Sequence, residues 1–482
     1  MHYRIMMRVL GLMLMLFSVA MLPPAGISLW YDDGAFYSFG WSFVLILGVG
    51  LMLWLPVMRT RDELRTREGF MVTALFWVVL GTAGSLPLYL SADAGLTYTD
   101  AFFESFSGLT TTGATVMTGI EHLPESIRLY RQQLQWMGGM GIIVLAVAIL
   151  PMLGVGGMQL YRAEMSGPMK DNKLAPRIAE TAKALWMIYA GLTVACGLGY
   201  WLAGMSPFDA IGHAFSTVAI GGFSTYDGNI GVFDNGMVEA VAIVFMLLAA
   251  ANFGLHFVAF RSRNPAQYLK DPEYRFFLLI IVGLIGVTTV TLWVTSAETG
   301  LRALRIGAFE ATSIMTTTGF SSTGFAHFPL FLPFLLFMAS FFGGCAGSTA
   351  GGMKSIRILL LWQQGVREVK RLIHPNGVFP VKVGRAEVPD RVLNAVWGYF
   401  SVYVFVFLVL LTAMLGTGLD FVTSWSAVGS AMNNLGPGLG AVASNYSAIP
   451  DTSKWLLCFA MLMGRLEIFT LIIVLSPMFW RR

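Results

Sequence analysis

Two short runs of threonine that end in glycine are the most polar features of an otherwise strongly apolar chain. The sequence TTTG occurs at residues 110–113 and again at residues 316–319, each time after a short apolar segment that is expected to be helical. Threonine and glycine are poor helix formers. Irregular backbone at membrane depth is tolerated only where it is buried or lines a water-filled cavity. Backbone carbonyls in such a place can replace the water shell of a passing cation.

The same pattern recurs along the chain in a partly degenerate form. Four glycines recur roughly every 110 residues, and a serine stands six residues before each of them. Four unrelated glycine loops would not explain the shared serine. The serines are Ser107, Ser216, Ser313 and Ser430. The predicted ion-contacting filter residues, which are each glycine and the two residues before it, are Thr111, Thr112, Gly113, Ile220, Gly221, Gly222, Thr317, Thr318, Gly319, Asn434, Leu435 and Gly436.

The filter residues predict the kind of ion as well as its path. Glycine permits backbone conformations that turn carbonyls toward an axis, and the short helix before each glycine directs its partially negative C-terminus at the same place. No Asp or Glu lies in the four segments. Carbonyl dipoles without carboxylates suit a weakly hydrated monovalent cation, which must also leave quickly.

A glycine-rich stretch, GGCAGSTAGG at residues 343–352, interrupts a predicted span. It contains more glycines than the alternative, a helix-packing seam, requires, so we expect an irregular loop beneath the filter. The residues of interest in it are Gly343, Gly344, Gly347, Ser348, Thr349, Gly351 and Gly352. Arg465 lies about ten residues into the last apolar segment, where an arginine is a functional candidate. The alternative is a structural ion pair that snorkels, and Glu467, two residues away, lies on a different helix face.

Other polar residues have structural interpretations that we favour. Glu104, His213 and Glu310 stand nine residues before three of the glycines. They could be ion ligands, but we expect structural groups behind the filter. Asn252 and His256 are four residues apart, as two metal ligands can be, but they have no third partner. We expect polar packing there.

The elements that position these residues are predicted from apolar segments about 20 residues long. The expected spans cover residues 5–24, 38–57, 70–90, 132–154, 182–204, 236–260, 276–296, 329–360 with an interruption, 393–415 and 455–478. Four segments are too short to cross, namely residues 98–110, 207–219, 304–316 and 421–433. The fold class is therefore an all-α polytopic membrane protein. Four membrane–pore helix–membrane units surround a central ion pathway, and two extra transmembrane helices precede them.

Composition supports a membrane protein, because 56% of the 482 residues are hydrophobic and only 12% are charged, against roughly 25% charged in soluble domains. The three cysteines, Cys196, Cys345 and Cys458, are odd in number and lack paired spacing, which argues against a disulfide framework or a thiolate metal site. The first apolar run imitates a secretory signal, but no small-x-small cleavage site precedes Pro23. We expect a retained span.

Basic residues follow the second, fourth, sixth and eighth predicted spans. By the positive-inside rule, these loops and both termini are cytoplasmic, and the short segments enter from outside.

Three further motifs accompany the filter segments: QWMGGMGIIVLAVAILPMLGVGG from Gln135, GGCAGSTAGGMKSIR from Gly343 and MGRLEIFTLIIVLSP from Met463. With these motifs the whole chain resembles the TrkH/KtrB family of potassium transport proteins, and most closely its TrkH branch. The resemblance implies potassium preference, because all four filter glycines are retained. It also implies an intramembrane gate at residues 343–352, with Arg465 in the pore and in contact with the gating loop. Its expected partners are a second copy of the chain and a cytoplasmic TrkA subunit with nucleotide-binding regulatory domains.

We therefore predict gated, channel-like potassium uptake across the bacterial inner membrane, with potassium as the transported ligand and no nucleotide site on this chain. A proton- or sodium-coupled symporter is the alternative, although it would favour titratable relays or inverted repeats. No catalytic constellation indicates an enzyme, and nothing indicates nucleic-acid binding. The basic loops are candidate partner-docking surfaces, or serve orientation and anionic-lipid attraction. The predicted division is residues 1–69 for two N-terminal helices, then 70–160, 161–265, 266–375 with the gating loop, and 376–482 for the four pore repeats.

Overall fold

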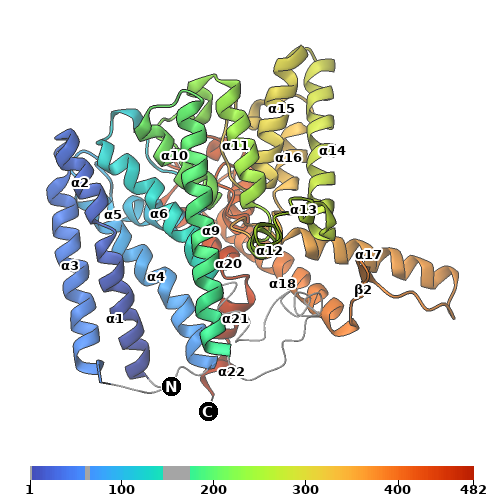
Figure 1. Cartoon of the computed structure of the whole chain (residues 1–482), viewed down its shortest axis with the longest axis horizontal. Coiled ribbons are helices and arrows are strands. Elements are labelled where there is room, and N and C mark those ends of the chain that lie inside the picture. Colours follow the sequence, from blue (N-terminus) through green and yellow to red (C-terminus); the bar gives the residue numbers. More distant parts are fainter. Residues whose placement is uncertain (1–2, 60–65, 145–173, 482) are drawn as a thin grey trace.

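The computed structural model describes residues 3–59, 66–144 and 174–481, and helices dominate it (Figure 1). Three N-terminal helices, α1 (Tyr3–Val19), α2 (Leu22–Tyr31) and α3 (Phe36–Trp54), form one side of the molecule. Gly11 and Gly50 bring α1 and α3 together, since a Cβ on Gly11 would lie 2.8 Å from the Gly50 carbonyl oxygen. Close packing at small residues is the usual way in which membrane helices associate.

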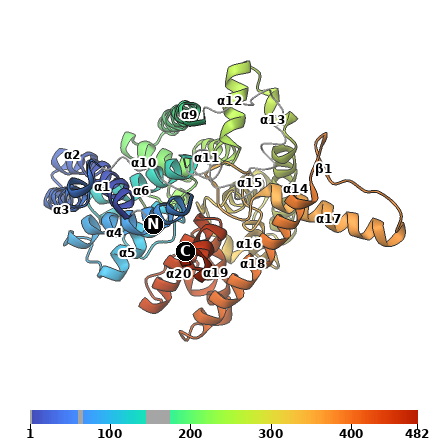
Figure 2. The same cartoon turned by 90° about the horizontal axis from the view of Figure 1, so that it is seen from below.

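The remaining helices form four groups, in each of which a long helix is followed by a short one, and we call these groups repeats 1 to 4. Their members follow one another around the molecule when it is seen from below (Figure 2). Repeat 1 contains α4 (Thr66–Leu90), α5 (Tyr98–Leu109) and α6 (Glu125–Val144). Repeat 2 contains α9 (Leu174–Leu202), α10 (Pro207–Ala219), α11 (Gly236–Ala249) and α12 (Phe253–Ser262), and α13 (Ala266–Lys270) leads from it into repeat 3. Repeat 3 contains α14 (Pro272–Val294), α15 (Gly300–Met315), α16 (Leu332–Ala339) and α17 (Ser355–Ile373), and repeat 4 contains α18 (Asp390–Leu415), α19 (Phe421–Asn433), α20 (Asp451–Arg465), α21 (Phe469–Leu475) and α22 (Pro477–Trp480). This is the predicted fold class.

The four predicted short segments are helices α5, α10, α15 and α19. Three of them begin at a capping side chain that accepts a hydrogen bond from a backbone N–H of the first turn: Thr97, Ser206 and Asp420. The hydrogen bonds that Thr423 makes hold the pKa of the Asp420 carboxyl below its usual value, so this cap is ionised at neutral pH. Helix α15 begins four residues before its predicted start at 304, directly after the extended Thr299.

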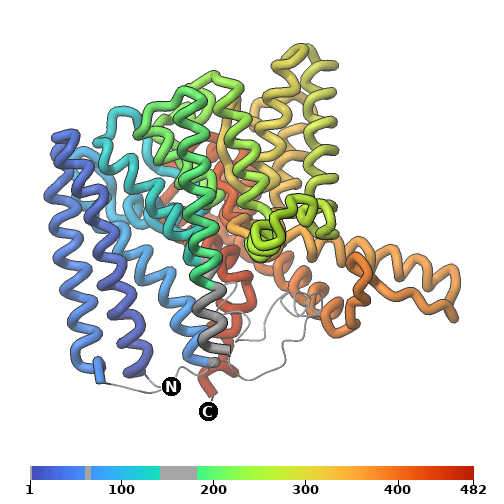
Figure 3. Tube along the Cα trace, in the orientation of Figure 1, coloured from blue at the N-terminus to red at the C-terminus, as the bar shows by residue number. Residues whose placement is uncertain are grey.

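Two of the predicted continuous spans are wrong. The chain bends by 97° between α11 and α12, where Figure 3 shows α12 nearly end-on, and by 114° between α20 and α21. At the first bend the Asn252 side chain caps α12 by accepting from the Gly254 N–H, which starts a new helix. At the second, Glu467 and Ile468 adopt positive φ angles of 53° and 55°.

The predicted interruption in residues 329–360 is confirmed, because α16 ends at Ala339 and α17 begins at Ser355. Among the described residues, six helices are long and apolar enough to cross a membrane, or eight spans if each bent pair counts as one. The predicted span 132–154 begins in α6 and runs beyond the described residues. Both termini lie at the same end of the molecule (Figure 1).

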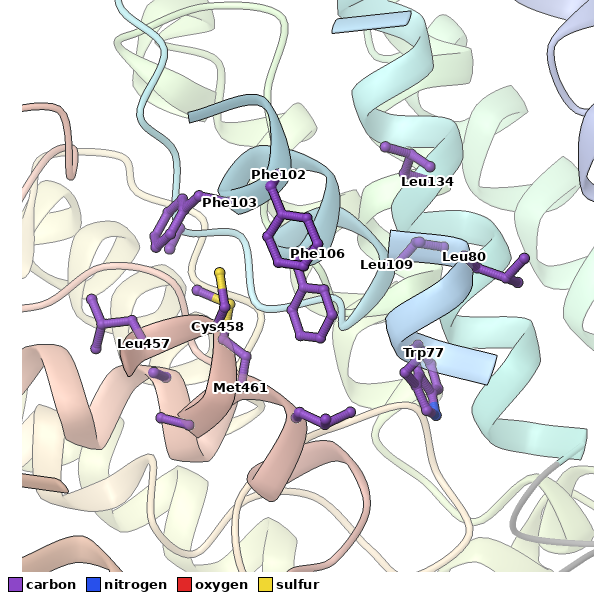
Figure 4. Close-up of a cluster of buried hydrophobic side chains, with 14 of the residues drawn as sticks. Trp77, Leu80, Phe102, Phe103, Phe106, Leu109, Leu134, Leu457, Cys458 and Met461 are labelled. Carbon is purple, nitrogen blue, oxygen red and sulfur yellow. The ribbon is translucent and has the colours of Figure 1, made fainter. Parts of the chain in front are cut away.

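Apolar side chains hold the short helices between the longer ones. In Figure 4, Phe103 and Phe106 of α5 lie near Cys458 and Met461 of α20. The Phe102 ring centroid is also 4.6 Å from that of Trp455. This contact joins repeat 4 to repeat 1.

One part of the chain lies apart from this packing, whereas the three cysteines belong to it. Helix α17 projects from the bundle together with a small hairpin of β1 (Lys382–Val383) and β2 (Ala386–Glu387), as Figures 1 and 2 show. The three cysteines, Cys196, Cys345 and Cys458, are buried and unpaired.

Candidate ion-binding site

Each short helix ends in the same backbone geometry. The residue two before the filter glycine adopts the left-handed conformation, and the glycine itself has a positive φ. The φ angles of the first residue are 52° at Thr111, 55° at Ile220, 63° at Thr317 and 52° at Asn434; those of the glycines are 82° at Gly113, 79° at Gly222, 76° at Gly319 and 101° at Gly436. Positive φ is natural for glycine and a genuine outlier for a β-branched residue such as Ile220. The surrounding packing therefore imposes this geometry.

The shared serine explains how the geometry is held. In each repeat its carbonyl oxygen accepts from the N–H of the residue before the glycine. The N···O distances are 2.9 Å from Thr112 to Ser107, 2.8 Å from Gly221 to Ser216, 2.9 Å from Thr318 to Ser313 and 2.9 Å from Leu435 to Ser430. The hydrogen bond reverses the chain at the C-terminus of the short helix, as a Schellman-type cap does.

The four filter segments lie around one centre, each against the next. A Cβ on any filter glycine would strike the carbonyl oxygen of the residue before the glycine in the following repeat. These distances are 2.0 Å from Gly113 to Gly221, 2.1 Å from Gly222 to Thr318, 2.0 Å from Gly319 to Leu435 and 2.8 Å from Gly436 to Thr112. The contacts run from repeat 1 through 2, 3 and 4 and back to 1, so they close a circle. We call the four carbonyls, of Thr112, Gly221, Thr318 and Leu435, the carbonyl ring.

Hydroxyl groups brace parts of this ring. In repeat 1 the hydroxyls of Thr110 and Thr112 are 2.8 Å apart, and in repeat 3 those of Thr316 and Thr318 are also 2.8 Å apart. The Asn434 amide donates to the Thr112 hydroxyl over 3.0 Å, which ties repeat 4 to repeat 1. All these side chains are buried. Their oxygens and the ring carbonyls offer a cation neutral oxygen ligands and no carboxylate.

The three titratable residues before the glycines bind the chain that leaves the filter. Glu104 accepts from the Val116 N–H over 2.9 Å, and Glu310 accepts from the Ser322 N–H over 2.8 Å. His213 Nε2 lies 2.9 Å from the Ser224 hydroxyl. All three side chains are fully buried. These contacts fit the structural interpretation of the three residues.

The glycine-rich stretch, residues 343–352, forms a loop between α16 and α17, which we call the glycine loop. Gly343, Gly347 and Gly352 have φ angles of 65°, 71° and 74°, which rule out a continuous helix. Within the loop the Ser348 hydroxyl donates to the Cys345 carbonyl over 2.7 Å. The Gly344 carbonyl accepts from the Ser355 N–H over 2.9 Å, at the start of α17.

The glycine loop lies directly against three repeats, at a filter residue of repeat 3 and at the C-terminal ends of the short helices of repeats 2 and 4. The Gly351 N–H donates to the Thr317 hydroxyl of repeat 3 over 2.7 Å. The Gly352 N–H donates to the Asn433 carbonyl of repeat 4 over 3.1 Å. The Thr349 hydroxyl donates to the Val218 carbonyl of repeat 2 over 3.1 Å. No side chain fits at Gly351, because its Cβ would lie 1.9 Å from the Asn433 carbonyl oxygen.

Arg465 reaches the glycine loop from the last residue of α20. Its side chain is buried, and one guanidinium nitrogen donates to the Thr349 carbonyl over 3.2 Å. Its Nε and other Nη find no hydrogen-bond partner within the described part of the chain. Glu467, two residues along the chain, pairs with Arg357 instead. An unneutralised guanidinium repels a cation that approaches the loop.

Comparisons with known proteins match this architecture over its whole length. The family description "TrkH: Cation transport protein" matches residues 36–482. The chain belongs to the TrkH family. It is 57% identical over 482 residues to "Trk system potassium uptake protein TrkH" of Halomonas elongata, with 100% of both chains covered. It is 52% identical over 482 residues to the protein of the same name from Escherichia coli K12, again over 100% of both. The crystal structure of the potassium transporter TrkH from Vibrio parahaemolyticus matches with a TM-score of 0.93 and 54% identity over 100% of both chains. The chain is therefore a polytopic membrane transport protein and not an enzyme.

In this TrkH-family structure the predicted filter residues come together, and so do the glycine loop and Arg465. Asn252 and His256 do not form a metal site, since Asn252 caps α12 and His256 Nε2 lies 2.9 Å from the Leu248 carbonyl oxygen. Among the residues that the structure describes, no three His, Cys, Asp or Glu side chains gather as metal ligands would.

Sequence reasoning missed the polar face of α6. Arg131, fully buried, pairs with Glu104 over 2.7 Å and lies 4.3 Å from the centre of the Phe223 ring. Gln132 and Gln135 lie beside it and reach repeat 2. The signal was the sequence RQQLQ at residues 131–135, at the start of an otherwise apolar predicted span. Polar side chains in such a place face protein rather than lipid.

Proposed function

We propose that this chain is the ion-conducting subunit of a potassium uptake system in the bacterial inner membrane. The observation that carries the proposal is the closed circle of filter contacts, in which each glycine lies against a carbonyl of the next repeat. Potassium would exchange its hydration water for the carbonyl ring and neighbouring filter oxygens, and move inward down its electrochemical gradient. The names of the full-length relatives, which are potassium uptake proteins, support potassium as the cargo.

The predicted filter residues supply the ion contacts in this proposal, and the glycine loop with Arg465 supplies the gate. In the conformation described, the loop is hydrogen-bonded to three repeats beneath the ring, and Arg465 holds the Thr349 carbonyl. A guanidinium there raises the electrostatic barrier for a cation. Withdrawal of the loop, with Arg465, would open the path.

The wider assembly follows from the same proposal. Both termini lie at one end of the molecule, which we assign to the cytoplasm from the basic loops. We propose a homodimer and a TrkA-like cytoplasmic subunit that binds the regulating nucleotide, because this chain carries no nucleotide motif. The four pore repeats correspond to residues 70–160, 161–265, 266–375 and 376–482, after two N-terminal transmembrane helices in residues 1–69.

The second candidate is a proton- or sodium-coupled potassium symporter. The repeats contact one another head to tail in a single circle, whereas many symporters pair inverted repeats around broken helices. The test is rubidium tracer uptake into proteoliposomes that contain the purified chain, with a potassium gradient and no gradient of protons or sodium. Uptake under these conditions supports the channel-like pathway. Uptake that appears only with a proton or sodium gradient would replace it with symport, and no uptake under any gradient would mean that the path needs another subunit.

A further inference from the structure

The filter segment of repeat 2 lacks the side chains that brace repeats 1 and 3. In those repeats, threonine hydroxyls three residues and one residue before the glycine contact each other. The equivalent residues of repeat 2 are Ala219 and Gly221, which have no hydroxyl. The Ser216 hydroxyl behind them is buried and has no hydrogen-bond partner among the described residues. Something else must fix the direction of the Gly221 carbonyl, which is one of the four ring members.

A side chain of repeat 1 fixes the direction of this carbonyl. Gln135, fully buried on α6, donates from Nε2 to the Gly221 carbonyl over 2.6 Å. Its Oε1 accepts from the Phe223 N–H over 3.1 Å. A backbone N–H can only donate and a carbonyl can only accept, so these two partners define which way the Gln135 amide faces. The amide therefore clamps the backbone on both sides of Gly222.

The Gln135 side chain occupies the space that a side chain at residue 221 would need. A Cβ on Gly221 would lie 2.3 Å from the Gln135 Cδ. Gly221 is not among the residues with positive φ, so its backbone conformation does not demand glycine. It is the Gln135 side chain that excludes any larger residue here. Two neighbours extend the contact, since Gln132 donates to the Phe223 carbonyl over 3.3 Å and Arg131 to the Ser224 carbonyl over 3.1 Å.

We propose that Gln135 is a positioning residue for cation discrimination, which aims the Gly221 carbonyl at the ion path from the neighbouring repeat. The proposal rests on the proposed function of the carbonyl ring as a potassium filter. Without the clamp, the Gly221 carbonyl can rotate and adapt to a smaller ion. Discrimination between potassium and sodium then falls, while the path itself remains, because the threonine braces of repeats 1 and 3 do not involve Gln135.

The test compares two glutamines on the same helix. Gln135→Met keeps the length of the side chain and removes both hydrogen bonds. The matched control is Gln133→Met, because Gln133 is also buried and donates to the Ala20 carbonyl over 2.7 Å, away from the filter. The measurement is sodium competition against rubidium uptake in proteoliposomes. We expect roughly tenfold weaker potassium preference in Gln135→Met, as the loss of the buried hydrogen bond to the Gly221 ring carbonyl implies, and wild-type preference in Gln133→Met.

A rescue variant separates positioning from a general loss of stability. Gln135→Ala with Ala219→Thr and Gly221→Thr opens the space beside residue 221 and installs the threonine pair of repeats 1 and 3. We expect it to restore most of the preference that Gln135→Ala alone loses. If Gln135→Met does not fold, the comparison of Gln135→Ala with this triple variant decides the question, and equal preference in those two overturns the proposal.

The remaining outcomes also test the role of Gln135 and the filter assignment. Wild-type preference in folded Gln135→Met, or an equal loss in Gln133→Met, would overturn the positioning role. Gly113→Ser separates this failure from failure of the proposed filter. If Gly113→Ser loses preference and Gln135→Met does not, only the role of Gln135 is wrong. If neither variant loses preference, the filter assignment itself is wrong.

Discussion

Alanine at each of the four filter glycines should damage ion discrimination by unequal amounts. The perturbation is a single methyl group, and the structure gives the space that it meets. The gap from the added Cβ to the facing carbonyl oxygen is 2.0 Å at Gly113, 2.1 Å at Gly222, 2.0 Å at Gly319 and 2.8 Å at Gly436. Gly436→Ala should therefore be the mildest of the four substitutions.

Two terms set the expected magnitude. All four glycines have positive φ, so alanine introduces a backbone penalty of about 1–2 kcal/mol at every position. The steric term differs. Contacts of a Cβ closer than 3.0 Å are essentially never seen, so the facing carbonyl must retreat by about 1 Å at the first three positions and by a few tenths of an ångström at Gly436. A carbonyl that retreats by about 1 Å leaves the reach of the ion. We expect Gly113→Ala, Gly222→Ala and Gly319→Ala to lose potassium preference roughly tenfold more than Gly436→Ala.

The assay is sodium competition against rubidium uptake by each purified variant in proteoliposomes, with the melting temperature as a check on folding. Gly26→Ala is the control, because no atom lies within 4 Å of its added Cβ. The reasoning is refuted if Gly436→Ala is as unselective as the other three. It is also refuted if the three crowded variants fold and retain wild-type preference.

Three further variants and one omission test other parts of the proposal. Arg465→Ala should raise resting rubidium flux by one to two orders of magnitude, which corresponds to about half of the free-energy barrier that unit charges at 4 Å would impose. Unchanged flux in a folded protein would mean that Arg465 has a structural role. Thr317→Val removes the acceptor of the Gly351 N–H and should also raise resting flux; an unchanged flux would show that this hydrogen bond does not hold the loop. Glu104→Gln leaves the Arg131 guanidinium buried without its counter-charge, so a loss of about 3 kcal/mol in stability is expected, and an unchanged melting temperature would contradict it. Omitting the regulatory subunit from proteoliposomes should change the gating of rubidium flux without abolishing it, and complete loss would place part of the path in that subunit.

The short helices were predictable because their signals are local. Each is a short apolar segment with a polar residue near its start and a glycine after its end, and these features fix length and termination. The breaks at Ala250–Asn252 and Leu466–Ile468 were not predictable in this way. Neither contains glycine or proline, and the second carries its positive φ on Glu467 and Ile468. Tertiary packing imposes that geometry against the preference of the residues.

The repeated serine shows where a pattern identifies a position but not its chemistry. Its recurrence indicated no particular role, and the feature common to all four repeats is a backbone hydrogen bond to the serine carbonyl. The hydroxyl bonds the filter backbone in repeats 3 and 4, from Ser313 to Phe320 and from Ser430 to Gly436. In repeats 1 and 2 the hydroxyls of Ser107 and Ser216 have no hydrogen-bond partner among the described residues. A small residue that permits the close turn is what the position requires.

Contacts between different repeats leave no trace in the internal periodicity of the sequence. A period near 110 residues compares each repeat with its own equivalents, so it finds the glycines, which recur. Gln135 reaches from repeat 1 to Gly221 of repeat 2, and Asn434 from repeat 4 to Thr112 of repeat 1. Neither contact has an equivalent among the described residues of the other repeats, so the period gives no signal for either. Gln135 contacts the filter at a position where the segments differ, because Gly221 stands where repeat 1 has Thr112, and a comparison of the four segments alone does not show which side chain occupies that space.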